Sequence, residues 1–175
     1  MPRWAIKRSE VRVSSEEASG QHHGRDIKIE KFMQPVNTVA PSTIEREAFR
    51  VLLSSRTPRV PVVDEEELLV GFVIDGHLLA SALPDYLKVM NDVSFVSEAG
   101  NEWVDYFTGL SERPVGEVMS TEVSYAEVGT SEVVAAHKMV RGGVSSVVVT
   151  HHGRVVGIVN RLNLLGAIVD AGSND

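Results

Sequence analysis

Two short runs contain residues of the types that bind metals or transfer protons. His151 and His152 are adjacent, and Asp64 begins an acidic run that ends at Glu67. Neighbouring side chains on an extended chain point in opposite directions, so the histidine pair is more typical of a solvated turn than of a metal site. Four consecutive acidic residues likewise favour a charged turn. The chain contains no Gly-x-Ser-x-Gly, phosphate-loop or His-Glu-x-x-His motif. We therefore predict that it is not an enzyme and holds no metal.

The composition argues against several other classes of function. The 175 residues carry a formal net charge of -7, from 24 acidic and 17 basic residues, which disfavours binding to nucleic-acid phosphates and anionic lipids. The absence of cysteine removes disulfides, thiolate zinc sites and a cysteine nucleophile. No apolar run approaches the roughly 20 residues that span a bilayer. We therefore predict a cytoplasmic protein that binds neither nucleic acid nor membrane.

The elements that would position a site occur twice in the same order. Each copy is predicted to contain a short strand, a helix, a two-stranded hairpin and a closing helix. In the first copy these are Val36–Val39, a helix starting at a capping box from Ser42 to Glu45, Arg59–Val63, Leu68–Ile74 and Asp75–Leu83. In the second copy they are Val123–Tyr125, a helix capped by Gly129, Ser146–Thr150, Val155–Asn160 and Leu162–Val169.

The two copies also keep one register. Thr130 follows Thr43 by 87 residues (130 − 43), and Gly157 follows Gly71 by 86 residues (157 − 71). One residue has been lost at the hairpin turn, where a change in length costs little. A match that preserves both spacing and order indicates a duplication.

The predicted fold class is α+β, with two tandem βαββα-type units packed as a pseudo-twofold pair. Aromatic residues between the copies, among them Trp103, favour a packed cap or a dimer surface. The predicted boundaries are a flexible tail at 1–26, the first unit at 27–83, a helical connector at 84–114, the second unit at 115–171 and a C-terminal tail at 172–175.

The two copies resemble CBS domains, which occur in tandem pairs called Bateman modules. The resemblance covers residues 27–83 and 115–171. It is carried by Phe32-Met33 and Val118-Met119, by Arg59–Asp64, and by Gly71-Phe72-Val73 and Gly157-Ile158-Val159. It implies that the two sheets pack together, that clefts form between the units and that two pairs form a homodimer. It further implies that a cleft binds a small adenosyl ligand such as AMP, ADP, ATP or S-adenosylmethionine, with no resident cofactor.

The chain departs from the family where nucleotide-binding members place Ser or Thr after the second hairpin strand and Asp three residues later. Those residues hold phosphate and the ribose hydroxyls. The first copy has Ile74 and His77 at these positions, and the second has Asn160 and Asn163. The Asn163 amide can still accept a hydrogen bond from a ribose hydroxyl, whereas Ile74 offers no polar atom. The resemblance therefore favours the second copy, with Arg161 able to reach phosphate.

Two hypotheses follow from this resemblance. The first is a regulatory module that senses an adenosyl ligand and signals through a homodimer or an unidentified protein partner. The second is a structural dimerisation or interaction module whose clefts bind no nucleotide, which the missing Asp in both copies favours. The ligand-binding residues predicted under the first hypothesis, including strand residues that would line the adenine, are Asn160, Arg161, Asn163, Arg59, Val60, Pro61, Ser145, Ser146, Val148 and His77.

Overall fold

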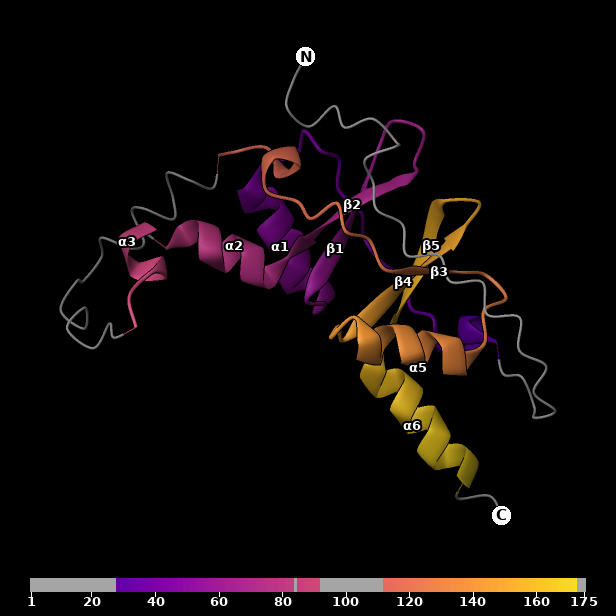
Figure 1. Cartoon of the computed structure of the whole chain (residues 1–175). Coiled ribbons are helices and arrows are strands. Elements are labelled where there is room, and N and C mark those ends of the chain that lie inside the picture. The colour runs from indigo at the N-terminus through magenta and orange to yellow at the C-terminus, as the bar shows by residue number, and fades with distance from the viewer. Residues whose placement is uncertain (1–27, 84, 92–111, 173–175) are drawn as a thin grey trace.

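The computed structural model of the chain describes residues 28–83, 85–91 and 112–172 (Figure 1). Within these ranges the first copy contributes α1 (Glu45–Ser55), β1 (Arg59–Val63), β2 (Leu69–Ile74) and α2 (Asp75–Ala82), and the short α3 (Asp85–Lys88) belongs to the connector. The second copy contributes β3 (Tyr125–Glu127), α5 (Glu132–Arg141), β4 (Ser146–His151), β5 (Arg154–Asn160) and α6 (Arg161–Gly172). A 3-10 turn precedes each copy, η2 (Ile29–Phe32) and η4 (Val115–Glu117). This α+β arrangement of two tandem units confirms the predicted fold class.

Each unit is a small sheet with two helices on one face. β1 and β2 form an antiparallel pair, and β4 pairs antiparallel with β5 and parallel with β3. Alternate strand residues point towards the helices, as the two-residue period of a strand requires. The core of the first unit contains Val60 and Val62 with Ala48 and Leu52, and the second unit repeats this packing around Val147.

The opposite faces of the two sheets meet each other. Phe72 from β2 packs there against Val148 and Ile158 from the second sheet. Val123, which was predicted to begin a strand, joins this inter-unit core, and β3 starts two residues later at Tyr125. Burial of this shared core holds the two units together as a pair.

The segments that precede the two copies are exchanged between the units. Gln34 bridges to Ile158 in the second unit, and Ser120 bridges to Phe72 in the first. The same reciprocity holds deeper in the two cores, where Ile29 packs in the second unit and Val115 in the first. Reciprocal contacts of this kind define the pseudo-twofold relation of the pair.

The exchanged segments explain the glycine in each copy of the Gly-hydrophobic-hydrophobic strand. A Cβ atom on Gly157 would overlap Met33 and would lie 2.9 Å from the backbone oxygen of Gln34. A Cβ atom on Gly71 would lie 2.8 Å from the oxygen of Ser120. Only glycine allows the crossing segment to approach the strand this closely.

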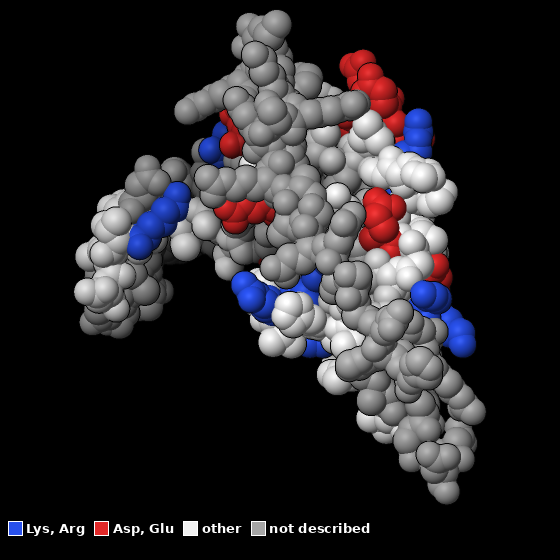
Figure 2. Space-filling view, turned by 45° about the vertical axis from the view of Figure 1, so that its right-hand side comes forward, with Lys and Arg blue, Asp and Glu red and all other residues white. Residues whose placement is uncertain are grey.

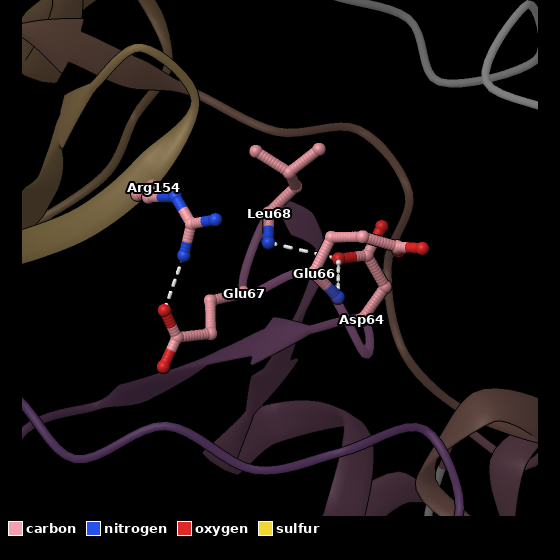
Figure 3. A network of polar contacts seen from close by, with 5 residues as sticks. All are labelled: Asp64, Glu66, Glu67, Leu68 and Arg154. Carbon is pink, nitrogen blue, oxygen red and sulfur yellow. Dashed lines mark hydrogen bonds and ion pairs between the residues drawn. The ribbon is translucent and has the colours of Figure 1, made fainter.

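The two hairpin tips touch each other (Figure 3). Leu68 bridges to Arg154, its counterpart 86 residues later, and Glu67 forms an ion pair with the same arginine. Asp64 shapes the first tip, because its Oδ1 accepts the N–H groups of Glu66 at 3.1 Å and Leu68 at 2.8 Å. The acidic run is thus a turn that contacts the second unit, not only a solvated turn.

The strand predicted at Val36–Val39 is wrong: it is reduced to one bridge from Val39 to Val62. In the second unit the N–H of Val128 extends the corresponding pairing by donating to the oxygen of Thr150 at 2.9 Å. The equivalent residue in the first copy is Pro41, which has no N–H group to donate.

The predicted helix caps, Ser42 and Gly129, are also wrong, since both precede the true caps. α1 follows Ile44, and α5 follows Ser131, whose Oγ accepts the N–H of Val134 at 3.5 Å. In both copies a tight turn closes before the helix begins. These turns are closed by hydrogen bonds from Thr43 N to Ala40 O and from Thr130 N to Glu127 O.

The connector contributes less to the described structure than the two units do. A short helix, α3, follows α2 as predicted, whereas Trp103 lies outside the described residues. The end of the connector is held at the start of α1. There the Arg113 guanidinium pairs with the buried carboxylate of Glu45 at 2.9 Å, and the backbone oxygen of Arg113 accepts the backbone N–H of Glu45 at 2.8 Å. Within the described ranges, no helix is both long and apolar enough to cross a membrane.

Candidate functional site

Each unit places its candidate polar residues where the hairpin ends and the closing helix begins. In the first unit, the N–H of Asp75 donates to the oxygen of Pro58 at 3.0 Å. The equivalent bond in the second unit runs from Arg161 to Ser145 at 2.8 Å. These bonds fix the first turn of each closing helix against the start of the central strand, so the two junctions have the same backbone geometry.

The Arg59 cluster consists of Arg59, Ile74, Asp75 and His77. Arg59 lies opposite Ile74 in the β1–β2 ladder, and its guanidinium carbon is 5.3 Å from the centre of the Phe72 ring. Burial lowers the pKa of the Arg59 guanidinium, and the negative charge of Asp75 partly offsets this effect by raising it. His77 is exposed on the first turn of α2.

The Ser146 cluster consists of Ser145, Ser146, Asn160, Arg161 and Asn163. Ser146 is fully buried opposite Asn160, while Arg161 is exposed and Asn163 is half-buried on the first turn of α6. The cluster therefore brings hydroxyl, amide and guanidinium groups to one junction. These groups can accept from and donate to ribose hydroxyls and can donate to phosphate oxygens.

Three predicted strand residues have side chains that face away from any open surface. Val60 is fully buried among the residues under α1 and α2, and Val148 is fully buried in the inter-unit core. Pro61 is buried as well, and its carbonyl oxygen accepts the N–H of Val39 at 3.1 Å. Arg59 and Ser146, at the strand starts, are buried as well, but they lie at the junctions with the closing helices.

Three residues of these junctions were missing from the sequence prediction. Gln34 reaches the Ser146 cluster from the exchanged segment, and its Oε1 accepts the amide N–H of Asn160 at 3.3 Å. Phe72 lies under the Arg59 guanidinium, and Asp75 supplies the negative charge nearby. The position of Asp75 at the strand–helix junction was visible in the sequence, whereas the crossing of Gln34 was not.

The histidine pair and the acidic run at 64–67 do not combine into a metal site in the described structure. His151 and His152 lie at the second hairpin tip with ring centres 4.2 Å apart. Glu127 is near them, but its two oxygens accept the Thr150 hydroxyl at 2.8 Å and the backbone N–H of His152 at 3.2 Å. In the part of the chain that is described, no group of three or more His, Asp or Glu side chains is placed to hold a metal ion.

The fold and its two equivalent junctions define a paired-repeat module. The CBS domain family model matches residues 26–83 and 115–170, which is most of the chain, and the chain belongs to that family. The match follows the two units identified from the internal repeat. As a CBS pair, the chain belongs to a family of regulatory modules.

Solved structures support the same assignment. A CBS domain of a CBS domain-containing membrane protein from Sphaerobacter thermophilus is 25% identical, with a TM-score of 0.63 over 81% of this chain and 88% of that one. A CBS domain-containing protein from Kribbella flavida is 20% identical, with a TM-score of 0.68 over 82% and 99%. The CBS-pair protein CBSX2, determined in complex with AMP, is 23% identical, with a TM-score of 0.61 over 83% and 98%. No curated protein sequence matches the chain.

Proposed function

We propose that this CBS pair is a cytoplasmic, non-catalytic sensor that binds an adenosyl ligand at the Ser146 cluster. The observation that carries the proposal is the convergence of Ser146, Asn160, Arg161 and Asn163 at one strand–helix junction. These residues offer a hydroxyl, two amides and a guanidinium for the ribose and phosphate groups of such a ligand. The AMP complex of CBSX2, a protein with the same fold, supports the choice of ligand class.

The affinity is expected to be modest. Asn163 replaces a carboxylate that would accept charge-assisted hydrogen bonds, and neutral hydrogen bonds are weaker by about half. Asn160 also donates one of its two side-chain N–H groups to the Oε1 atom of Gln34, at 3.3 Å, which leaves only the other for a ligand. Both effects reduce affinity without removing the binding groups themselves.

The first test is a thermal-shift series with AMP, ADP, ATP, S-adenosylmethionine and NAD, each with and without Mg²⁺. A ligand that binds only the folded chain stabilises it by about 2.7 kcal/mol at a hundred times its dissociation constant. We expect at least one adenosyl compound to raise the melting temperature. An unchanged melting temperature at millimolar ligand would instead support the structural module.

The site assignment is tested by paired substitutions at equivalent positions. Asn163→Ala removes a predicted ligand contact and should weaken binding by about two- to tenfold. His77→Ala changes the equivalent position of the other unit, 86 residues earlier, and should have a smaller effect. Titration calorimetry with the ligand from the thermal-shift series measures both, and the reverse ranking would discard the assignment.

We also propose that the pair forms a homodimer through α6. Leu162, Leu165 and Val169 are 79%, 50% and 65% exposed, and their spacing of three and four residues places them on one helical stripe. A second copy would cover this apolar stripe. Size-exclusion chromatography with light scattering should give the wild-type chain twice its monomer mass of 19.1 kDa. The Leu162→Glu/Leu165→Glu variant should have the monomer mass, and the control Val156→Glu should keep the dimer mass.

A further inference from the structure

Two methionines occupy equivalent positions in the segments that cross between the units. Met33 and Met119 are 86 residues apart (119 − 33). Each immediately precedes a bridging residue, Gln34 in the first case and Ser120 in the second. Met33 packs against the core of the second unit, and Met119 packs against the core of the first. Each methionine side chain therefore helps to hold its crossing segment on the sheet that the segment joins.

The sulfur atoms lie directly over the glycines at which the segments cross. A Cβ atom on Gly157 would lie 2.6 Å from the Sδ of Met33, and one on Gly71 would lie 2.9 Å from the Sδ of Met119. No space therefore remains for a further atom between either sulfur and its strand. Both methionines are nevertheless only half-buried, whereas Met139 is 1% exposed. A small solute can thus approach two residues whose sulfur atoms are closely packed.

An oxygen atom added to either sulfur would find no free N–H group among the bridging residues. The N–H groups of Gln34 and Ile158 donate to each other's oxygens, at 2.8 and 2.9 Å. Those of Ser120 and Phe72 do the same in the other bridge, also at 2.8 and 2.9 Å. A sulfoxide is polar, and burying a polar atom without a hydrogen bond is unfavourable. The oxidised side chain must either bury its oxygen or rotate into solvent, and both outcomes weaken the contact.

Methionine is the sulfur-containing residue on which oxidation of this chain can fall. The chain contains five methionines and no cysteine. Hydrogen peroxide oxidises a thioether when the sulfur lone pair attacks one peroxide oxygen, so that an S–O bond forms as the O–O bond breaks. The leaving hydroxide takes the proton of the transferred oxygen and becomes water. The thioether loses two electrons and the peroxide gains them, which gives methionine sulfoxide.

We propose that Met33 and Met119 form a paired oxidation site, at which hydrogen peroxide converts the thioethers to sulfoxides and loosens the exchange of segments between the units. Oxidation of Met33 would also affect the Ser146 cluster, because the adjacent Gln34 accepts a hydrogen bond from Asn160 at 3.3 Å. The effect on a ligand rests on the function proposed above, whereas the oxidation site itself requires no ligand.

Peroxide treatment of the full chain tests the proposal. Peptide mass spectrometry follows the oxidation of each methionine, and circular dichroism gives the melting temperature. Met90, which is 43% exposed in the connector, should be oxidised first and the buried Met139 last. Met33 and Met119 should be oxidised between them, and the melting temperature should then fall by about 2–12 °C.

Leucine substitutions separate oxidation at the paired site from oxidation elsewhere in the chain. Met33→Leu/Met119→Leu keeps apolar side chains of similar volume but has no sulfur at the site, so peroxide should leave its melting temperature unchanged. The matched control Met90→Leu should lose as much as the wild-type chain. Should the double variant not fold, the single variants Met33→Leu and Met119→Leu should each lose less than the wild-type chain.

Three results would overturn the proposal. The first is oxidation of Met33 and Met119 no faster than that of Met139. The second is their oxidation without a fall in melting temperature, and the third is an equal fall in the wild-type chain and the double variant. None of these measurements uses a ligand, so failure of the adenosyl sensor in the thermal-shift series would leave this proposal standing.

Discussion

Replacement of Gly157 by alanine tests the packing of the exchanged N-terminal segment on β5. The new methyl group would overlap Met33, lying 2.6 Å from its Sδ, and would lie 2.9 Å from the backbone oxygen of Gln34. The methionine side chain can rotate away. The oxygen of Gln34 cannot move freely, because it accepts the N–H of Ile158 at 2.9 Å in the bridge that joins the segment to the strand.

The size of the effect follows from this overlap. Inserting a methyl group into a closely packed interior usually costs about 1–3 kcal/mol. For a chain of this length such a loss lowers the melting temperature by about 2–12 °C. Gly166→Ala is the matched control, since a Cβ atom there meets no atom within 4 Å and alanine favours the helix by about 1 kcal/mol.

Urea unfolding followed by circular dichroism measures both variants. We expect Gly157→Ala to lower the free energy of unfolding and Gly166→Ala to raise it slightly. The double variant Met33→Ala/Gly157→Ala should not recover the loss, because the backbone oxygen of Gln34 would still lie 2.9 Å from the new methyl group. A Gly157→Ala variant as stable as wild type would refute the argument that close approach of the crossing segment requires glycine.

Three further substitutions test the end of the connector and the first hairpin tip. Glu45→Ala leaves the partly buried Arg113 without its carboxylate and should lower the free energy of unfolding by about 1–3 kcal/mol, measured by urea unfolding; a change below 0.5 kcal/mol would show that the connector end is not held there. Asp64→Ala removes the acceptor of two backbone N–H groups and should destabilise the chain by about 1 kcal/mol. Glu67→Ala removes only an exposed ion pair with Arg154 and should change stability by less than about 1 kcal/mol in the same assay, so a larger loss than for Asp64→Ala would contradict the role assigned to the turn.

The elements that local chemistry specifies were predictable from the sequence. The strand Arg59–Val63 was predicted with the bounds that the structure shows, because a run of β-branched residues ends at an acidic turn. The N-cap of α1 was predicted two residues too early, at Ser42 instead of Ile44, because the capping-box pattern at Ser42 competes with a turn that uses Thr43. Short polar side chains can satisfy either arrangement, and the sequence does not rank them.

The candidate site was only partly predictable, because some of its contacts join residues that are far apart in the sequence. The resemblance to CBS domains pointed to Asn160 and Asn163, and the structure places both at one junction. The contact from Gln34 to Asn160 joins residues 126 positions apart and depends on an exchange that periodicity does not encode. The burial of Arg59 likewise arises from packing against Phe72 rather than from its neighbours in sequence.

Figure 2 shows that acidic and basic side chains are interspersed over the described part of one face, which net charge alone does not reveal.

The exchange of segments also fixes the order in which the chain can mature during synthesis. The first unit lacks the contacts of Val115 and Ser120 until the connector has been made. The segment at Gln34 has no strand to pair with until Ile158 has left the ribosome. At about 5–20 residues per second, the 126 residues that separate Gln34 from Asn160 take about 6–25 s to synthesise. The segment around Gln34 therefore cannot pack until the second unit has been synthesised. Neither repeat alone can complete its core, so the pair is the smallest unit that can fold fully.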